Sequence, residues 1–167
     1  MKIYKFKNYE KIFPSLYNGE VKRIIKVVPT NSPIEHMGST AVPGLHGKGI
    51  IDLIIYSSKD RVNEIKANLE KLGYEEGSSD KDRIFLRRDS KINGKNRRFH
   101  IHIILKKQIW NDHINFRDYL IANPKISSEY AELKKKAVVA CDNNGKIYRR
   151  LKDKFIKKHT EKAKNNY

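Results

Sequence analysis

The sequence predicts an α/β (α+β) domain in which a mixed β-sheet is flanked by helices and followed by a C-terminal helical cap. Two observations lead to this fold class. Short aliphatic or alternating segments, typical of strands, are interleaved with segments whose apolar residues recur at helical spacing. From Trp110 onward the pattern is helical. A chain of 167 residues fits one domain with a real core. We therefore expect a single domain over residues 1–167, with its core at about 9–105 and C-terminal helices at about 110–164.

The first half of the chain alternates helices and strands. Apolar residues recur at helical spacing over residues 9–28 and again over residues 60–72, which predicts two helices. Between them, residues 34–37 predict a short strand and residues 49–57 a longer, aliphatic strand of the kind that is buried on both faces. A Gly-Ser turn and a Pro-Gly loop separate these two strands.

The second half begins with a strand pair and ends in helices. Residues 74–82 are polar and predict a loop, whereas residues 83–88 and 98–105 alternate polar and apolar side chains as strands do. Asn93-Gly94 between these strands is a hairpin signal. We expect all four strands to share one sheet, covered by the first two helices. Three further helices are predicted over residues 112–122, 127–141 and 147–162.

The chain carries a large excess of positive charge. Its 36 Lys and Arg residues outnumber 19 Asp and Glu residues, which gives a formal net charge of +17. Such an excess raises the affinity for phosphate-rich partners and speeds their capture. The lysines concentrate at Lys134, Lys135 and Lys136 and over residues 152–164. Two interpretations stay open for them: a solvated helical face, or a surface that binds a nucleic acid as partner.

Hydropathy and cysteine content bear on location. No apolar stretch approaches the length of a membrane span, and residues 1–5 lack a hydrophobic signal region. The single cysteine, Cys141, cannot form an internal disulfide and has no CxxC companion. We therefore expect no membrane association, a reducing, cytoplasmic location, and a helix-packing role for Cys141.

The segment that joins the first two strands, with the second strand itself, combines the parts of a nucleotide and metal site. Gly38 permits backbone conformations that other residues resist and lets a ligand approach the chain. Ser39 and Thr40 add hydroxyls and backbone N–H groups in a turn, a usual way to hold phosphate. Lys48, in a Gly-flanked loop, suits a phosphate contact or an ordinary loop position equally. Asp52 interrupts an aliphatic strand, where a carboxylate is costly unless it binds a cation or a hydrogen-bond donor.

These residues belong to a longer string that resembles one family. The string His-x-Gly-Ser-Thr-x-Val-Pro-Gly-Leu-x-x-Lys-x-Ile-Ile-Asp, from His36 to Asp52, is similar almost position for position to the GrpB family of the nucleotidyltransferase (polymerase-beta-like) superfamily. Further matches are Phe-His-Ile-His-Ile at residues 99–103, Phe-Arg-Asp-Tyr-Leu at residues 116–120, and Tyr130 with Leu133-Lys134. The resemblance implies a minimal nucleotidyltransferase-like fold and a nucleoside triphosphate as ligand.

The resemblance also implies a divalent metal at the nucleotide phosphates, and here the sequence departs from the superfamily. Catalysis of that type uses two carboxylates spaced i, i+2 on one strand and a third from another strand. Asp52 instead has Ile50 and Ile54 at the i−2 and i+2 positions, and His100 and His102 stand in the region of the third carboxylate. One Asp with two or three His suits a transition metal, whereas Mg²⁺ prefers oxygen ligands. We expect Asp52, His100 and His102 to hold the cofactor, either Mg²⁺ or a transition metal.

Two functions stay open at this point. One is a nucleotidyltransferase-type enzyme that moves a nucleotidyl group from a nucleoside triphosphate to an acceptor. The other is a non-catalytic nucleotide or nucleic-acid binding module, which the missing second carboxylate favours; metal-dependent nucleotide hydrolysis is a third reading. For the enzyme we expect one cleft, with catalytic residues Asp52, His102 and His36 and phosphate-binding residues Gly38, Ser39, Thr40 and Lys48. His36 alternatively only hydrogen-bonds the turn.

Overall fold

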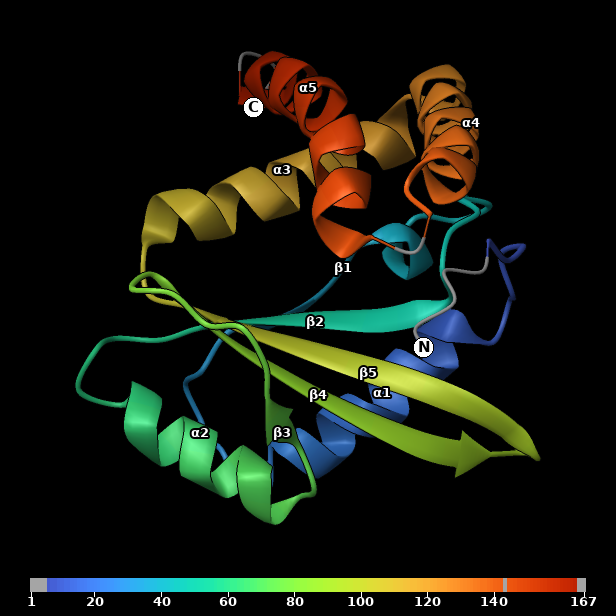
Figure 1. Cartoon of the computed structure of the whole chain (residues 1–167). Helices are drawn as coiled ribbons and strands as arrows, with labels where there is room; N and C mark the ends of the chain where they lie inside the picture. Colours follow the sequence, from blue (N-terminus) through green and yellow to red (C-terminus); the bar gives the residue numbers. More distant parts are fainter. Residues whose placement is uncertain (1–5, 143, 165–167) are drawn as a thin grey trace.

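The computed structural model describes residues 6–142 and 144–164, and one mixed sheet lies at the centre of the described part (Figure 1). Its strands are β1 (Ile34–Met37), β2 (Ile50–Tyr56), β3 (Glu75–Glu76), β4 (Arg83–Ile92) and β5 (Lys95–Ile104). Their order in the sheet is β1-β2-β5-β4-β3. β2 and β5 run parallel, and the other neighbouring strands run antiparallel. The predicted fold class is therefore confirmed, with all four expected strands in one sheet.

Helices cover both faces of this sheet (Figure 1). One face carries α1 (Phe13–Ile24) and α2 (Val62–Lys71), and the other carries α3 (Lys107–Ala122), α4 (Pro124–Ala140) and α5 (Gly145–Lys164). A short 3₁₀ turn, η1 (Ser39–Ala41), follows β1 directly. Cys141 packs at the end of α4 with no exposed surface, as expected. None of the described helices is long and apolar enough to cross a membrane; the expectation about a signal segment concerns residues 1–5, which lie outside the described part.

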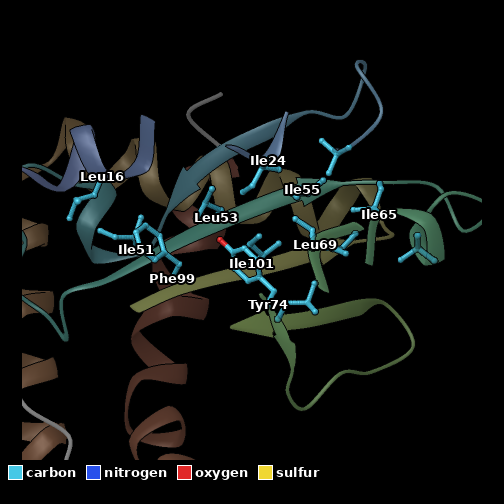
Figure 2. Packing of buried hydrophobic residues seen from close by; sticks show 14 of the residues in the cluster. Leu16, Ile24, Ile51, Leu53, Ile55, Ile65, Leu69, Tyr74, Phe99 and Ile101 are labelled. Atoms are coloured by element: carbon cyan, nitrogen blue, oxygen red, sulfur yellow. The ribbon is translucent and has the colours of Figure 1, made fainter. Parts of the chain in front are cut away.

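The main hydrophobic core lies between the sheet and the helices α1 and α2, as Figure 2 shows. Alternate residues of the two central strands are fully buried there: Ile51, Leu53 and Ile55 of β2, and Phe99, Ile101 and Ile103 of β5. Burial of each such side chain contributes roughly 1.5–3 kcal/mol to stability. Because side chains alternate along a strand, the residues between them point to the opposite face, beneath the C-terminal helices. That face carries the polar residues of the candidate site.

Three segments differ from the sequence-based prediction. The first helix is shorter than residues 9–28, because Pro14 is tolerated only in the first turn and places the start at Phe13. Residues 74–82, expected as a loop, contain the edge strand β3, which two glutamates form without any apolar signal. β4 and β5 extend past their predicted ends as a polar ribbon. The turn between them is as predicted, since Asn93 and Gly94 have positive φ angles of 48° and 74°.

Candidate functional site

A carboxylate and two imidazoles meet on the sheet face beneath the C-terminal helices. Asp52 on β2 lies directly opposite His100 on the parallel strand β5, and His102 shares that face two residues further on. Nδ1 of His100 is 3.1 Å from Oδ1 of Asp52, and Nε2 of His102 is 3.8 Å from the same oxygen. The three side chains are between 13% and 20% exposed, so a ligand can reach the cluster.

These contacts shift the proton equilibria of the cluster. Burial raises the pKa of Asp52, but the adjacent imidazoles of His100 and His102 outweigh burial and hold that pKa well below its ordinary value. Burial, which disfavours the imidazolium, lowers the pKa of His102 although Asp52 opposes the shift. At neutral pH Asp52 is therefore a carboxylate and His102 a neutral imidazole, and these are the forms that bind metal ions.

The donor atoms of this cluster fit a divalent metal. One ligand atom from each of Asp52, His100 and His102 lies within 4.8 Å of the other two, and it is the one such group found among the described residues. Zinc takes nitrogen and oxygen donors at about 2.0–2.2 Å, so small side-chain rotations would close the three donors around an ion. Two imidazoles with a single carboxylate suit a transition metal better than Mg²⁺.

Gly38 brings the backbone of the turn onto this cluster. Its φ is +74°, and a Cβ at this position would lie 2.5 Å from Oδ2 of Asp52. Any side chain here would strain the backbone and displace the carboxylate. Ser39 follows at the start of η1, and its Oγ packs so closely on Gly47 that a Cβ there would overlap it. The turn therefore touches both the carboxylate and the loop that leads to β2.

A buried lysine faces this turn from the C-terminal helices. Lys134 on α4 is 3% exposed, and its Nζ has no hydrogen-bond partner among the described residues. The Nζ lies 3.3 Å from the place where a Cβ on Gly47 would stand, and 4.8 Å from the ring centroid of Tyr130. Burial, and then the charge of Lys152, lowers the pKa of Lys134 to about 7. An incoming anion would supply the partner that this ammonium lacks.

Two more lysines lie on the same side. Nζ of Lys152 on α5 is 4.4 Å from the ring centroid of Tyr148, and Nζ of Lys48 is 5.0 Å from it. Burial, and then the charge of Lys48, lowers the pKa of Lys152 to about 8. Positive charges that disfavour one another in this way would all be stabilised by one bound anion.

The cluster, the turn and the lysines line one cleft of about 530 Å³ between the sheet and the C-terminal helices. Among the residues expected at the site, the cleft is lined by Gly38, Ser39, Lys48, Asp52, His100 and His102. Residues that were not expected there also line it, and His113, Lys134 and Lys152 are among them. His113 and Lys152 lie in amphipathic helices and belong to no local sequence motif. Their place in the cleft becomes visible only when those helices pack on the sheet. For Lys134 the one available signal is its place in the Tyr-x-x-Leu-Lys match.

His36 and Thr40 lie outside this cleft, which corrects their expected roles. His36 is paired with Leu53 across β1 and β2, so its side chain points to the opposite face, where its ring stacks on Tyr17 with centroids 4.5 Å apart. The Thr40 hydroxyl donates to the carbonyl of Ile50 at 2.9 Å and lies 3.0 Å from Nε2 of His36. Because the hydroxyl proton is used, the imidazole N–H donates to Thr40. Both side chains are engaged within the turn and are not among the residues that line the cleft.

The lysines at residues 134–136 of α4 do not share one face of the helix. Lys134 lies inside the cleft, whereas Lys135 and Lys136 are exposed. Consecutive residues of a helix point in different directions, so the three lysines cannot form one face. Farther along, Lys164 is engaged by Asp112 at 3.3 Å and by Glu161 at 3.2 Å. The run of lysines in the sequence is therefore divided between the cleft and the outer surface.

Comparisons with known proteins identify the family. The model of the GrpB protein family matches residues 4–162, so the chain belongs to the GrpB family. YqkA, a UPF0157 protein of Bacillus subtilis, is 34% identical over 149 residues, which make up 87% of this chain and 43% of YqkA. The chain thus spans less than half the length of that relative. Neither name states an activity.

Two solved structures resemble the fold. The crystal structure of the conserved protein GrpB from Enterococcus faecalis matches with a TM-score of 0.81 and 30% identity, and the match covers 98% of this chain and 99% of that one. The similarity to Cid1 poly(U) polymerase, crystallised with MgATP, is distant: the TM-score is 0.48 at 12% identity, over 78% of this chain and 45% of that one.

Proposed function

We propose that this protein binds a nucleoside triphosphate with a divalent metal in the cleft and transfers the nucleotidyl group to an acceptor. The observation that carries the proposal is that the Asp52 cluster lines the same cleft as the buried Nζ of Lys134, which has no hydrogen-bond partner among the described residues. A metal ion would be bound by the Asp52 cluster on the sheet, and the phosphates around it would contact Lys134 on α4. The string from His36 to Asp52, which resembles the nucleotidyltransferase superfamily, supports the same assignment.

The phosphates would lie between η1 and the lysines. Lys134 gains a charge-assisted hydrogen bond when an anion binds, and the low polarity around its buried Nζ strengthens that interaction. Ser39 adds a hydroxyl from the turn, and Lys152 and Lys48 offset further negative charge. In the transfer step the acceptor hydroxyl attacks the α-phosphorus, the bond to the bridging oxygen breaks, and pyrophosphate leaves with that oxygen. The lysines stabilise the charge that develops on the pyrophosphate.

Asp52, His100 and His102 are the residues that would hold the metal. A bound divalent metal supplies Lewis-acid polarisation of the phosphate. Outside the cluster, His113 is the further imidazole that lines the cleft, and it takes the place expected for His36. Burial, and then the neighbouring His102, lowers the pKa of His113 to about 4, so its imidazole is neutral at pH 7 and accepts the acceptor's proton. The negative charge of the bound phosphates favours the imidazolium form of His113 that this proton transfer produces.

A non-catalytic binding module is the second candidate, and one observation favours it. In the superfamily pattern a second carboxylate stands two residues from Asp52. Here Ile50 and Ile54 occupy the two places at that spacing, and Ile54 is fully buried beneath α3, where it packs with Ile104 and Trp110. Phosphate binding needs only the turn and the lysines, whereas transfer also needs the metal cluster. A measurement of turnover therefore distinguishes the transferase, which should release pyrophosphate, from the binding module, which should not.

The test measures unfolding of wild type and Asp52→Ala with a nucleoside triphosphate, in the absence and presence of Mg²⁺, Mn²⁺ or Zn²⁺. Saturation a hundredfold above Kd stabilises a protein by about 2.7 kcal/mol. We expect Asp52→Ala to lose the metal-dependent part and the exposed control Asp60→Ala to keep it. Equal metal-dependent stabilisation of wild type and Asp52→Ala would refute the proposal that Asp52 binds the metal. Pyrophosphate release with added acceptor then distinguishes the enzyme from the module.

A further inference from the structure

A second, basic groove runs from the cleft along the β4–β5 hairpin, and we propose that it binds a single-stranded nucleic acid as the acceptor. The proposal rests on the proposed function, because it assigns the acceptor of the same site. It places the nucleic-acid surface on the hairpin instead of on the lysines of α4 and α5.

The composition of the groove matches a polyanion. The groove has a volume of about 950 Å³, and among the sixteen described residues that line it seven are Lys or Arg, against the single carboxylate of Asp89. Six lining residues also line the cleft, among them Lys48, His100 and Arg149. A strand in the groove would therefore end beside the Asp52 cluster, where an acceptor hydroxyl is required.

The hairpin supplies a straight row of side chains for such a strand. Arg87, Asp89 and Lys91 alternate along β4 and lie opposite His100, Arg98 and Asn96 of β5. Residues that are directly opposite share a face, so all six point to the same side of the sheet as Asp52. The row repeats every 6.6–6.8 Å, about two residues of a strand, which suits the successive phosphates of an extended chain. The hairpin runs past the end of β2, whose pairing with β5 begins at Ile50 and Arg98 (Figure 1).

The cations of the groove differ in how firmly the protein engages them. Arg97 makes two hydrogen bonds of 2.8 Å to Glu10, and Arg98 makes two of 2.6 Å to Asp89. Arg87 is held less firmly, 3.8 Å from a largely exposed Glu75. Lys91 is exposed, and ion pairs of the hairpin among the described residues involve Arg87, Lys95, Arg97 and Arg98 instead. Arg87 and Lys91 are therefore the cations of the row that are best able to turn to a phosphate.

The aromatic content of the groove favours phosphate contacts over base stacking. Phe85 is the phenyl ring in its lining, and a Cβ on Gly77 would lie 2.5 Å from that ring. The same ring meets His100 edge-on, with centroids 4.9 Å apart. Because Phe85 is packed on both of these neighbours, it offers no open platform for a base. Binding through phosphates should show little sequence preference.

The experiment follows the anisotropy of fluorescent 20-nucleotide single strands of RNA and of DNA as salt is raised. For single strands, each phosphate contact adds about 0.7 to the slope of log affinity against log salt. We expect Arg87→Gln/Lys91→Gln to lower the slope by about 1.4, which is roughly a 65-fold loss of affinity at 50 mM salt relative to 1 M. The control Lys135→Gln/Lys136→Gln makes the same charge change at exposed positions of α4 and should keep the slope.

Two outcomes would overturn the proposal. One is an equal slope change in the groove variant and in the control, which would mean that net charge alone governs binding. The other is displacement of the strand by polyglutamate as effectively as by unlabelled strand, which would mean a generic polyanion surface. The groove variant should keep its nucleotide-dependent stabilisation, and Asp52→Ala should keep strand binding. Strand binding therefore tests the groove proposal, and nucleotide-dependent stabilisation tests the proposed function, so that either can be refuted without the other.

Discussion

The buried ammonium of Lys134 makes the stability of the protein depend on pH in a way that one substitution should remove. Lys134→Met keeps most of the unbranched side chain and removes the charge that has no hydrogen-bond partner among the described residues. In the ligand-free protein, we expect this substitution to stabilise the fold at neutral and acidic pH. The same substitution should weaken nucleotide binding, because it removes the partner proposed for the phosphates.

The pKa of Lys134 sets the size and the sign of the effect. This pKa is about 7 in the folded protein and 10.5 ordinarily, a difference of about 3.5. Between these two pH values the unfolded chain binds more protons than the folded one, so stability rises with pH across that interval. At about 1.36 kcal/mol per pKa unit, the penalty is about 4–5 kcal/mol. The penalty is complete below pH 7 and absent above pH 10.5.

The assay is urea unfolding at pH 6, 7, 8 and 9 for wild type, Lys134→Met and the exposed control Lys135→Met. The difference in unfolding free energy between wild type and Lys134→Met should shrink by roughly 1.4 kcal/mol per pH unit above pH 7. Wild type and Lys135→Met should give parallel profiles, since Lys135 is exposed. A constant difference between wild type and Lys134→Met across this range would refute a buried, unpaired ammonium at this position.

Two further predictions concern the turn. Gly38→Ala should abolish metal binding measured by calorimetry, because its Cβ would displace the Asp52 carboxylate; Gly44→Ala is the matched control, with a similar φ of +76° and open space around the Cβ. If Gly38→Ala kept its metal affinity, the close approach of residue 38 to the Asp52 carboxylate would be contradicted. Thr40→Val should cost about 1–3 kcal/mol of unfolding free energy, since it leaves a carbonyl and an imidazole N–H without their partner. Metal affinity in Thr40→Val should stay that of wild type, and its loss would place Thr40 in the site after all.

The sequence predicts most of the fold because each face of the central strands is strongly patterned. β2 is apolar except at Asp52, and residues 100–103 of β5 alternate histidine with isoleucine, so the period of two identifies both the core face and the polar face. A carboxylate in an aliphatic strand has no ordinary packing role, which is why Asp52 stands out without any structural information. The parallel register then places His100 opposite it.

The same reasoning could not place His36 or Lys134. The face on which His36 lies depends on the register of β1 against β2, and a shift of one residue would turn its side chain into the cleft. No turn signal specifies that register, because a long loop separates the two strands. Lys134 belongs to a run of three lysines that reads as a solvated surface. Its burial follows from how α4 packs against η1 and α5, which is a tertiary property.

The positive charge of the cleft should let it bind a nucleotide without a metal ion. Among the described residues, six Lys or Arg line the cleft against two aspartates. The imidazoles of His102 and His113 are neutral at pH 7 because burial lowers the pKa of each. A site built from several carboxylates repels phosphate until a metal offsets them, whereas this cleft attracts phosphate without one. Triphosphate alone should therefore stabilise the protein, and metal should add a separate increment through Asp52. Metal-free binding is consequently expected of the enzyme and the binding module alike, so the metal increment and turnover decide between them.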